Sequence, residues 1–177
     1  MMSLELIIGP MFSGKTTELI RRCRRLKAVG KKVLIINHKK DNRNGIHSVS
    51  THDGVQLTAK SVDMVTVHWF DTFKDEYDVI AIDEGQFFTG LRDVVIALKK
   101  LDKAVIISGL QGDAEMNAWK CITNLIPLAD DIIQTKALCV KCHGPAAFTR
   151  RLQPGGSQID VGGKDKYMAC CYKCYNT

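Results

Sequence analysis

The chain has 177 residues, 45% of them apolar, which is enough for one sizeable core and too few for a large second domain. No run of about 18 apolar residues could cross a bilayer, and residues 1–6 lack the features of a signal peptide, so we expect a soluble, cytoplasmic protein without a membrane partner. The formal charge of +6 suits a polyanionic partner, either nucleotide phosphates or nucleic acid.

Short runs of Ile, Val and Leu alternate with polar turns and helix-like stretches along most of the chain. Because these runs are continuously apolar, they predict strands buried on both faces, as in a parallel sheet covered by helices. We predict strands at 4–8, 32–37, 79–82, 104–109 and 131–135, and helices at 15–29, 91–100 and roughly 118–125. The sequence therefore predicts an α/β domain over residues 1–135.

Positive charge is concentrated on the first predicted helix and just after it. One interpretation is a solvated helix face with ATP as the only bound anion, and the other is a nucleic-acid surface. The residues concerned are Arg21, Arg22, Arg24, Arg25, Lys27, Lys31 and Lys32.

A phosphate-binding motif lies between the first predicted strand and the first predicted helix. The segment reads Gly9, Pro10, Met11, Phe12, Ser13, Gly14, Lys15 and Thr16, which fits G-x-x-x-x-G-K-[ST]. Its glycines let backbone N–H groups turn inward, Lys15 adds a charge for the β- and γ-phosphates, and the Thr16 hydroxyl would serve Mg²⁺. The motif predicts an enzyme that uses ATP or GTP.

The predicted strand at 79–82 ends in two acids, Asp83 and Glu84, at the sheet edge where ligands bind in open α/β folds. Asp83 is the candidate Mg²⁺ ligand, and Glu84 is either a catalytic base or a plain solvated acid. Gln86 is a further candidate for nucleotide binding. Phe87 and Phe88 belong either to the core or to the wall of a site for a planar substrate.

Two C-x-x-C pairs lie near the end of the chain, at Cys139 and Cys142 and at Cys171 and Cys174. Four thiolates at this spacing favour a closed structural zinc site, with a redox dithiol as the alternative. Cys170 has no partner at this spacing, and the four thiolates make a ligand role for His143 unnecessary. From about residue 136 the pattern is too irregular to extend the sheet, so residues 136–177 are expected to form a small zinc-binding lobe.

Taken together, these motifs resemble the thymidine kinases of the cellular, poxviral and bacterial type. The likeness covers nearly the whole chain and includes the Pro-Met-Phe filler of the phosphate loop. Further segments match in order, namely Asp41-x-Arg43, Thr51-His52-Asp53, residues 83–88, residues 124–128, both cysteine pairs and residues 162–167.

The resemblance implies a fold of the P-loop NTPase type with a zinc lobe whose lasso loop closes over thymidine. It implies that Glu84 is the base for the nucleoside 5′-hydroxyl, that Asp83 and Thr16 hold Mg²⁺, and that Asp41 and Arg43 lie near the phosphates. The nucleoside would contact the base-pocket residues Met11, Phe87 and Leu110, together with Thr149, Gln158, Ile159, Asp160, Val161, Gly162 and Tyr167.

One position departs from the family pattern, because Ala114 stands where an aromatic residue usually packs near the base. Trp119 fills the place of a second aromatic and could compensate in part. The resemblance also implies a homotetramer that dTTP inhibits, acting in nucleotide salvage in the cytoplasm, or in the host cytoplasm if the protein is viral.

Two other functions were weighed. A nucleic-acid-binding ATPase would use the basic helix to follow phosphates, but it leaves residues 84–88 and 162–167 without a role. An inactive relative is not indicated, since Lys15, Thr16, Asp83 and Glu84 are all present. No nucleic-acid partner is expected.

Overall fold

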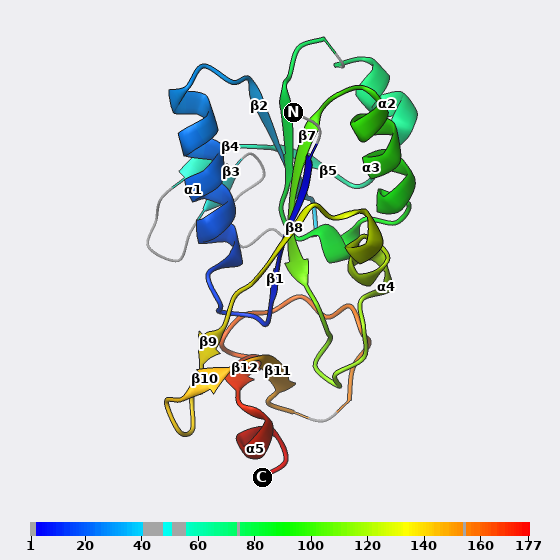
Figure 1. The fold of residues 1–177 in the computed structure, drawn as a ribbon. Helices are drawn as coiled ribbons and strands as arrows, with labels where there is room; N and C mark the ends of the chain where they lie inside the picture. Colours follow the sequence, from blue (N-terminus) through cyan, green and yellow to red (C-terminus); the bar gives the residue numbers. More distant parts are fainter. Residues whose placement is uncertain (1–2, 41–47, 51–55, 74, 154) are drawn as a thin grey trace.

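The computed structural model describes residues 3–40, 48–50, 56–73, 75–153 and 155–177. A central sheet is covered by helices, and a smaller lobe lies beyond one end of its strands (Figure 1). The fold is thus a mostly parallel α/β sheet with an additional cysteine-rich lobe, as the sequence predicts.

The central sheet has six strands in the order β5-β2-β6-β7-β1-β8, and every neighbouring pair is parallel. The predicted strands all form, and β2 and β6 are buried at every position. Such burial on both faces explains their unbroken apolar runs. The strands are β1 (Ser3–Gly9), β2 (Val33–His38), β5 (Lys60–Val62), β6 (Val79–Ile82), β7 (Ala104–Leu110) and β8 (Asp131–Gln134).

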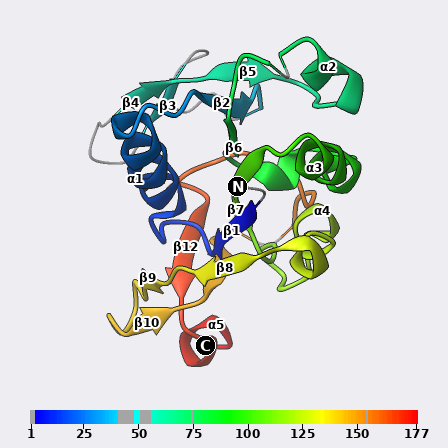
Figure 2. The same ribbon diagram turned by 45° about the horizontal axis from the view of Figure 1, so that its top comes forward.

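Helices cover both faces of the sheet, with α1 on one side and α2, α3 and α4 on the other (Figure 2). Leu19, Ile20 and Cys23 of α1 pack with the sheet residues of one core cluster. A larger cluster on the opposite face includes Phe88 and the apolar side of α3. The helices are α1 (Lys15–Ala28), α2 (Val67–Asp71), α3 (Leu91–Lys100) and α4 (Lys120–Thr123), with 3-10 turns η1 (Gly85–Phe87) and η2 (Ile126–Leu128).

The lobe after β8 is built from two small antiparallel sheets, β10-β9 and β11-β12, and one short helix. Its own core cluster contains Ala137, Cys139, Ala146, Ala169 and Cys170. The elements are β9 (Ala137–Leu138), β10 (Pro145–Ala146), β11 (Phe148–Arg151), β12 (Tyr167–Cys170) and α5 (Tyr172–Tyr175). The boundary between residues 135 and 136 stays a prediction.

The helix predicted at about 118–125 is wrong in extent, since α4 is a single turn. Ala118 forms an isolated antiparallel bridge with Gly112, and Trp119 has extended backbone angles. Pro127 lies in the following turn η2 and cannot donate to a helical ladder. Four further elements have no counterpart among the predicted ones, namely β3 (Ser48–Ser50), β4 (Gln56–Thr58), β5 and α2.

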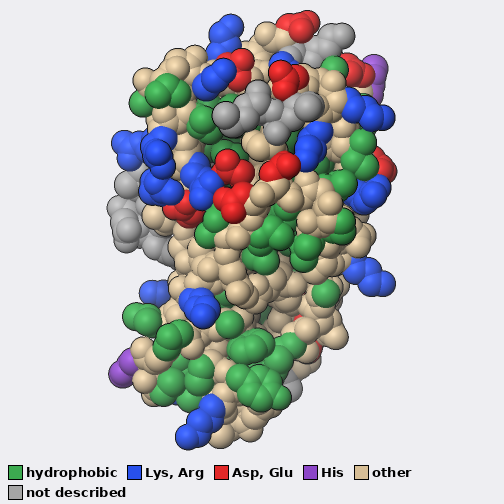
Figure 3. Space-filling view, viewed as in Figure 1, with side chains coloured by type: hydrophobic (Ala, Val, Ile, Leu, Met, Phe, Trp, Pro, Cys, Tyr) green, Lys and Arg blue, Asp and Glu red, His purple; other side chains and the backbone are tan. Residues whose placement is uncertain are grey.

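The surface differs between the two parts of the molecule. Charged side chains of both signs gather over the sheet and α1, whereas apolar side chains are prominent on the small lobe (Figure 3). Leu138, Val140 and Tyr172 of that lobe are each more than half exposed. Among the helices that the structure describes, none has both the length and the apolar character needed to cross a membrane.

Candidate active site

The phosphate loop joins β1 to α1 and contains two residues with positive φ, Phe12 at 65° and Gly14 at 79°. Glycine suits the second position because it adopts this region without strain from a Cβ atom. Gly9 is constrained by space instead, since a Cβ there would lie 2.7 Å from the backbone oxygen of Thr135. The loop therefore turns tightly into the N-terminus of α1, where backbone N–H groups and the helix dipole favour an anion.

Lys15 and Thr16 are the first two residues of α1. The Lys15 side chain is buried, and its Nζ donates to the backbone oxygen of Pro10 at 2.7 Å. The Thr16 hydroxyl donates to Asp83 Oδ2 at 3.0 Å, and Ser108 Oγ donates to Asp83 Oδ1. A hydroxyl and a buried carboxylate thus meet at the ends of β6 and β7, a pair of oxygen donors that fits Mg²⁺.

Glu84 follows in the left-handed region, with φ 51° and ψ 45°. Its carboxylate accepts a hydrogen bond from Gln86 Nε2 at 2.5 Å. The buried Gln86 in turn accepts from the backbone N–H of Leu110 at 3.0 Å. The turn after β6 therefore orients the Glu84 carboxylate through a side chain that is itself bonded to β7.

One cavity of about 330 Å³ joins the phosphate loop to the small lobe. Phe87 lies in its wall, and its ring meets Trp119 edge-on with centroids 6.4 Å apart. Phe88 is buried in the core instead. Phe87 therefore fits the interpretation as a wall of the site, and Phe88 fits the interpretation as a core residue. The lining residues are Met11–Thr17, Glu84, Gln86, Phe87, Leu110, Gly112–Ala114, Trp119, Thr149, Arg151, Gln158, Asp160–Gly162 and Tyr167.

Most of the candidate site residues come together around this cavity. The expected nucleoside contacts line it except Ile159, which is 41% exposed. Gly9, Pro10 and Asp83 lie beside it rather than in its lining. Asp41 and Arg43 fall outside the described residues. Ala114, which stands where the family usually has an aromatic residue, is buried and lines the cavity, and its backbone oxygen accepts from the hydroxyl of Tyr175 at 2.5 Å.

Sequence reasoning missed five residues of this region: Thr17, Ser108, Gly112, Asp113 and Arg151. Asp113 is buried and accepts hydrogen bonds from the backbone N–H groups of Glu115 and Asn117, at 3.0 and 2.8 Å, and from Gln158 Nε2 at 2.9 Å. Ser108 could have been found from its place at the end of a predicted strand. Asp113 and Arg151 carry no local motif.

The phosphate loop and the lobe are in direct contact. The backbone N–H of Met11 donates to the hydroxyl of Thr149 at 2.9 Å, between residues far apart in the sequence. On the other side of the loop, the hydroxyls of Ser13 and Thr135 are 2.7 Å apart. The loop is therefore held from both the sheet and β11.

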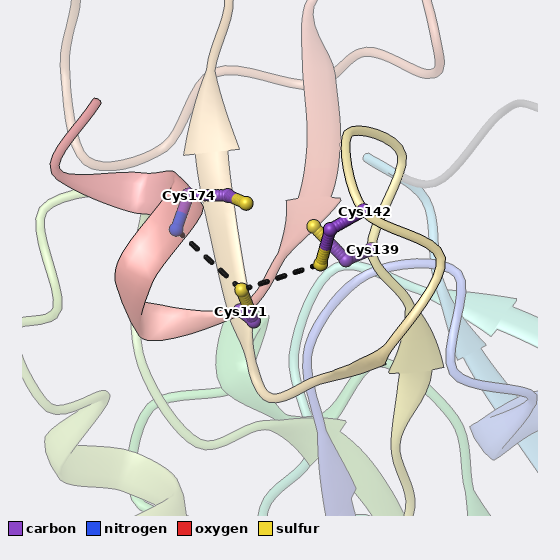
Figure 4. Close-up of side chains that lie close together, drawn as sticks. All are labelled: Cys139, Cys142, Cys171 and Cys174. Carbon is purple, nitrogen blue, oxygen red and sulfur yellow. Dashed lines mark hydrogen bonds between the residues drawn. The ribbon is translucent and has the colours of Figure 1, made fainter.

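The four paired cysteines converge in the lobe. The sulfurs of Cys139, Cys142, Cys171 and Cys174 all lie within 4.8 Å of one another (Figure 4). The sulfurs of Cys142 and Cys171 are 3.7 Å apart, and four ligands at about 2.3 Å from a tetrahedral zinc would be about 3.8 Å apart. The cluster has the donor set and size that a structural zinc ion needs.

Local hydrogen bonds shift the pKa values of two cysteines of this cluster in opposite directions. The backbone N–H of Cys171 is the main cause that lowers the pKa of Cys139 to about 6. Hydrogen bonding to Cys171 is the main cause that raises the pKa of Cys174 to about 12. A shared metal ion would remove this difference between the two pKa values, because a metal binds all of its cysteine ligands as thiolates.

Comparison with known proteins identifies the family. The family model described as "Thymidine kinase" matches residues 2–175. The thymidine kinase of Fowlpox virus (strain NVSL) is 38% identical over 176 residues, covering 98% of this chain and 96% of that one. The thymidine kinase of Acanthamoeba polyphaga mimivirus is 40% identical and covers 99% and 82%, and the cytosolic enzyme of Gallus gallus is 36% identical and covers 97% and 76%.

Likeness to solved structures is weaker. The replication initiator DnaA bound to AMPPCP and single-stranded DNA has a TM-score of 0.47 at 14% identity, over 77% of this chain and 41% of that chain. A match at that level carries no argument about function. The family model and the relatives, which span nearly the whole chain, place this protein in the thymidine kinase family.

Proposed function

We propose that this protein transfers the γ-phosphate of ATP to the 5′-hydroxyl of thymidine, giving dTMP and ADP. The observation that carries the proposal is one cavity that Met11–Thr17 of the phosphate loop, Glu84 and residues of the lobe line together. An acid that shares a cavity with a phosphate cradle and aromatic side chains suits transfer to a bound hydroxyl better than transfer to water.

The phosphate end of the cavity would bind and orient ATP. Backbone N–H groups at the start of α1 and the ammonium of Lys15 would hold the β- and γ-phosphates, so Lys15 would exchange its bond with Pro10 for the nucleotide. Mg²⁺ bound by Thr16 and Asp83 would neutralise charge that develops on the transferred group. Ser108 keeps the Asp83 carboxylate oriented toward Thr16.

Glu84 would act as the general base. Its carboxylate would accept the proton of the nucleoside 5′-hydroxyl as the oxygen attacks the γ-phosphorus. Gln86 holds the carboxylate in place through the 2.5 Å hydrogen bond, so little reorientation is needed during transfer.

The nucleoside end of the cavity would recognise thymine. Phe87 and Trp119 provide apolar faces for a planar base, and residues 158–162 would close over it. One methyl group is worth only about 1 to 3 kcal/mol in such a pocket, so deoxyuridine should also react. Ala114 makes the pocket less selective than an aromatic at that position would.

Zinc in the four-cysteine cluster would be structural. Four thiolates leave no open position for a reacting group, so the ion would hold the strands of the lobe rather than take part in chemistry. The proposal extends to inhibition by dTTP, a homotetrameric assembly and a cytoplasmic location, all supported by the family alone.

The nucleic-acid-binding alternative has less support. Arg21 and Arg22 of the basic run are already paired with Glu18, at 2.6 and 2.8 Å, and Arg22 also pairs with Glu5. DNA phosphates would have to compete with these acids for two of the seven basic side chains, and the cavity is accounted for by a nucleoside.

ADP release measured with a panel of nucleosides tests the proposal. We expect turnover with thymidine, weaker turnover with deoxyuridine and little without any nucleoside. ATP hydrolysis that is independent of nucleoside would contradict the kinase function, and hydrolysis stimulated by single-stranded DNA would favour the alternative.

A further inference from the structure

The segment of residues 155–162, here called the cover loop, closes one side of the cavity. Its residues Gln158, Asp160, Val161 and Gly162 line that cavity. Within the described part of the chain, no backbone–backbone hydrogen bond involves residues 155–162. The position of the cover loop therefore depends on side-chain contacts.

Arg151, the last residue of β11, makes the most extensive of these contacts. Its Nη1 lies 3.0 Å from Asp160 Oδ2, and its Nη2 donates to the backbone oxygen of Ser157 at 2.8 Å. The guanidinium also lies 5.4 Å from the centre of the Tyr167 ring. One side chain thus binds both the middle and the beginning of the cover loop.

The Arg151 side chain is only 9% exposed, which makes the contact with Asp160 energetically important. Its Nε has no hydrogen-bond partner among the described residues, and the nearest oxygen of Glu115 is 3.7 Å away. A buried guanidinium is costly unless a carboxylate compensates its charge. An open cover loop would withdraw Asp160 and Ser157 from Arg151, so these two charge-assisted contacts favour the closed position.

The loop also contacts residues other than Arg151. Lys166 Nζ lies 2.6 Å from Asp160 Oδ1, but the Lys166 side chain is 44% exposed. Water therefore competes for both charged groups and weakens this ion pair. Tyr167 donates to the backbone oxygen of Asp160 at 2.7 Å, and this neutral bond tolerates any side chain at 160. Gln158 Nε2 also donates to Oδ2 of the buried Asp113 at 2.9 Å, so Arg151 is the buried cation, and Asp113 the buried anion, among the anchors of the loop.

The strand that carries Arg151 is itself fixed to the phosphate loop. Thr149 and Arg151 are two residues apart in β11, so their side chains lie on the same face, and both line the cavity. The Thr149 hydroxyl binds the backbone N–H of Met11. The anchor of the cover loop is thereby held at a set distance from the phosphate loop.

We propose that Arg151 is a positioning residue that holds the cover loop closed over the nucleoside end of the cavity. The inference rests on the proposed function, because that function makes the cavity end a nucleoside subsite. Arg151 acts through Asp160 and Ser157, and its loss opens the loop without removing a group that reacts.

The kinetic test compares Arg151→Gln with Lys164→Gln, which removes the same charge from an exposed position of the same lobe. Arg151→Gln is expected to raise the KM for thymidine by about tenfold or more, while kcat and the KM for ATP change by less than about threefold. Arg151→Lys keeps the charge but loses the planar guanidinium that donates to two groups at once. Its KM for thymidine should lie between those of Arg151→Gln and Lys164→Gln. A KM for thymidine within about twofold of the wild-type value, or an equal rise in both KM values, overturns the proposal.

A second measurement does not depend on activity. Cleavage of the zinc-loaded protein by proteinase K within residues 153–163, mapped by mass spectrometry, should be at least about threefold faster in Arg151→Gln than in Lys164→Gln. Equal rates overturn the anchor even if the enzyme is a thymidine kinase, whereas absent thymidine turnover in the wild type overturns only the proposed function. If Arg151→Gln fails to fold, Asp160→Asn replaces it in both measurements with the same expected results.

Discussion

Glu84 occupies a backbone conformation that few residues other than glycine adopt. Glu84 has a φ of 51° and comes soon after the fully buried strand β6. Its side chain bonds to Gln86 and lines the cavity. Such conformations cost of order 1 kcal/mol or more and persist where the surrounding structure compensates for them. The strained position is what lets an acid at the end of β6 reach the space between the phosphate loop and the lobe.

Glu84→Gln removes the proposed base while keeping the size of the side chain. We expect kcat to fall by about 10² to 10⁴, while the affinity for ATP stays close to that of the wild type. Steady-state kinetics and equilibrium ATP binding measure the two quantities. Glu76→Gln, an exposed acid remote from the cavity, is the matched control, and unchanged turnover in Glu84→Gln would reassign the base.

Glu18 of α1 makes stability depend on pH in a definite direction. Its pKa is lowered to about 2, chiefly because Arg21 donates a hydrogen bond to its carboxylate, with a further contribution from Arg22. A carboxyl group with a lowered folded-state pKa stabilises the protein above its ordinary pKa of 4.5, and this stabilisation is lost as the pH falls toward 2.

Glu18→Gln should therefore lower the free energy of unfolding at pH 7 by about 1 kcal/mol or less, as expected for a pair near the surface. Urea unfolding at pH 7 and pH 4 should show a smaller difference between variant and wild type at pH 4. Glu76→Gln is the matched control for loss of an exposed carboxylate, since Glu76 has no ion pair among the described residues. A difference that grows on acidification would refute the assignment.

Residues of the site that form contiguous motifs could be predicted from the sequence, whereas isolated ones could not. Lys15 and Thr16 lie in a motif whose spacing reflects a strand, a turn and a helix. Glu84 follows a recognisable buried strand. Asp113 and Arg151 reach the cavity only because an irregular turn and the end of a two-stranded sheet fold against it, and neither contact has a sequence period.

At the scale of elements, the parallel strands were the most predictable features. β2 and β6 are apolar at nearly every position because both faces are covered. α4 was predicted too long because the apolar residues at 118–125 are shared between a bridge, one helical turn and a 3-10 turn. Periodicity cannot separate those three states over so few residues.

β11 connects the lobe to the phosphate loop through one hydroxyl, and Thr149→Val removes it while keeping the shape of the side chain. The Met11 N–H would then be left without its partner, at a cost of about 1 to 3 kcal/mol. We expect a lower free energy of unfolding and a raised KM for ATP, measured by urea unfolding and kinetics. Thr89→Val, at an exposed threonine, is the control, and two variants with equal behaviour would show that the contact is unimportant.

At the scale of the whole molecule, the cysteine cluster joins two segments that are far apart in the sequence. Cys139 and Cys142 follow β9, whereas Cys171 and Cys174 lie at α5, and the cover loop lies between the two pairs in sequence. The core cluster of the lobe contains only a few small residues besides its cysteines. A metal crosslink is the expected stabiliser of such a small core.

Cys171→Ser should therefore release zinc and raise the KM for thymidine or unfold the lobe, while the central sheet remains folded. Metal analysis, circular dichroism and kinetics measure these effects. Cys23→Ala is the control, because Cys23 is buried on the side of α1 that packs against the sheet. Burial raises the pKa of its thiol to about 11, and the variant should retain a full complement of zinc. Full zinc content in Cys171→Ser would contradict the assignment of the ligands.

The most direct test of the account follows the γ-phosphate itself. The purified protein is incubated with γ-labelled ATP, Mg²⁺ and thymidine, and the labelled products are separated. The geometry of one cavity shared by the phosphate loop, Glu84 and the lobe leads us to expect the label in thymidine 5′-monophosphate. Label that appears only in inorganic phosphate, at a rate unaffected by thymidine, would contradict the central claim.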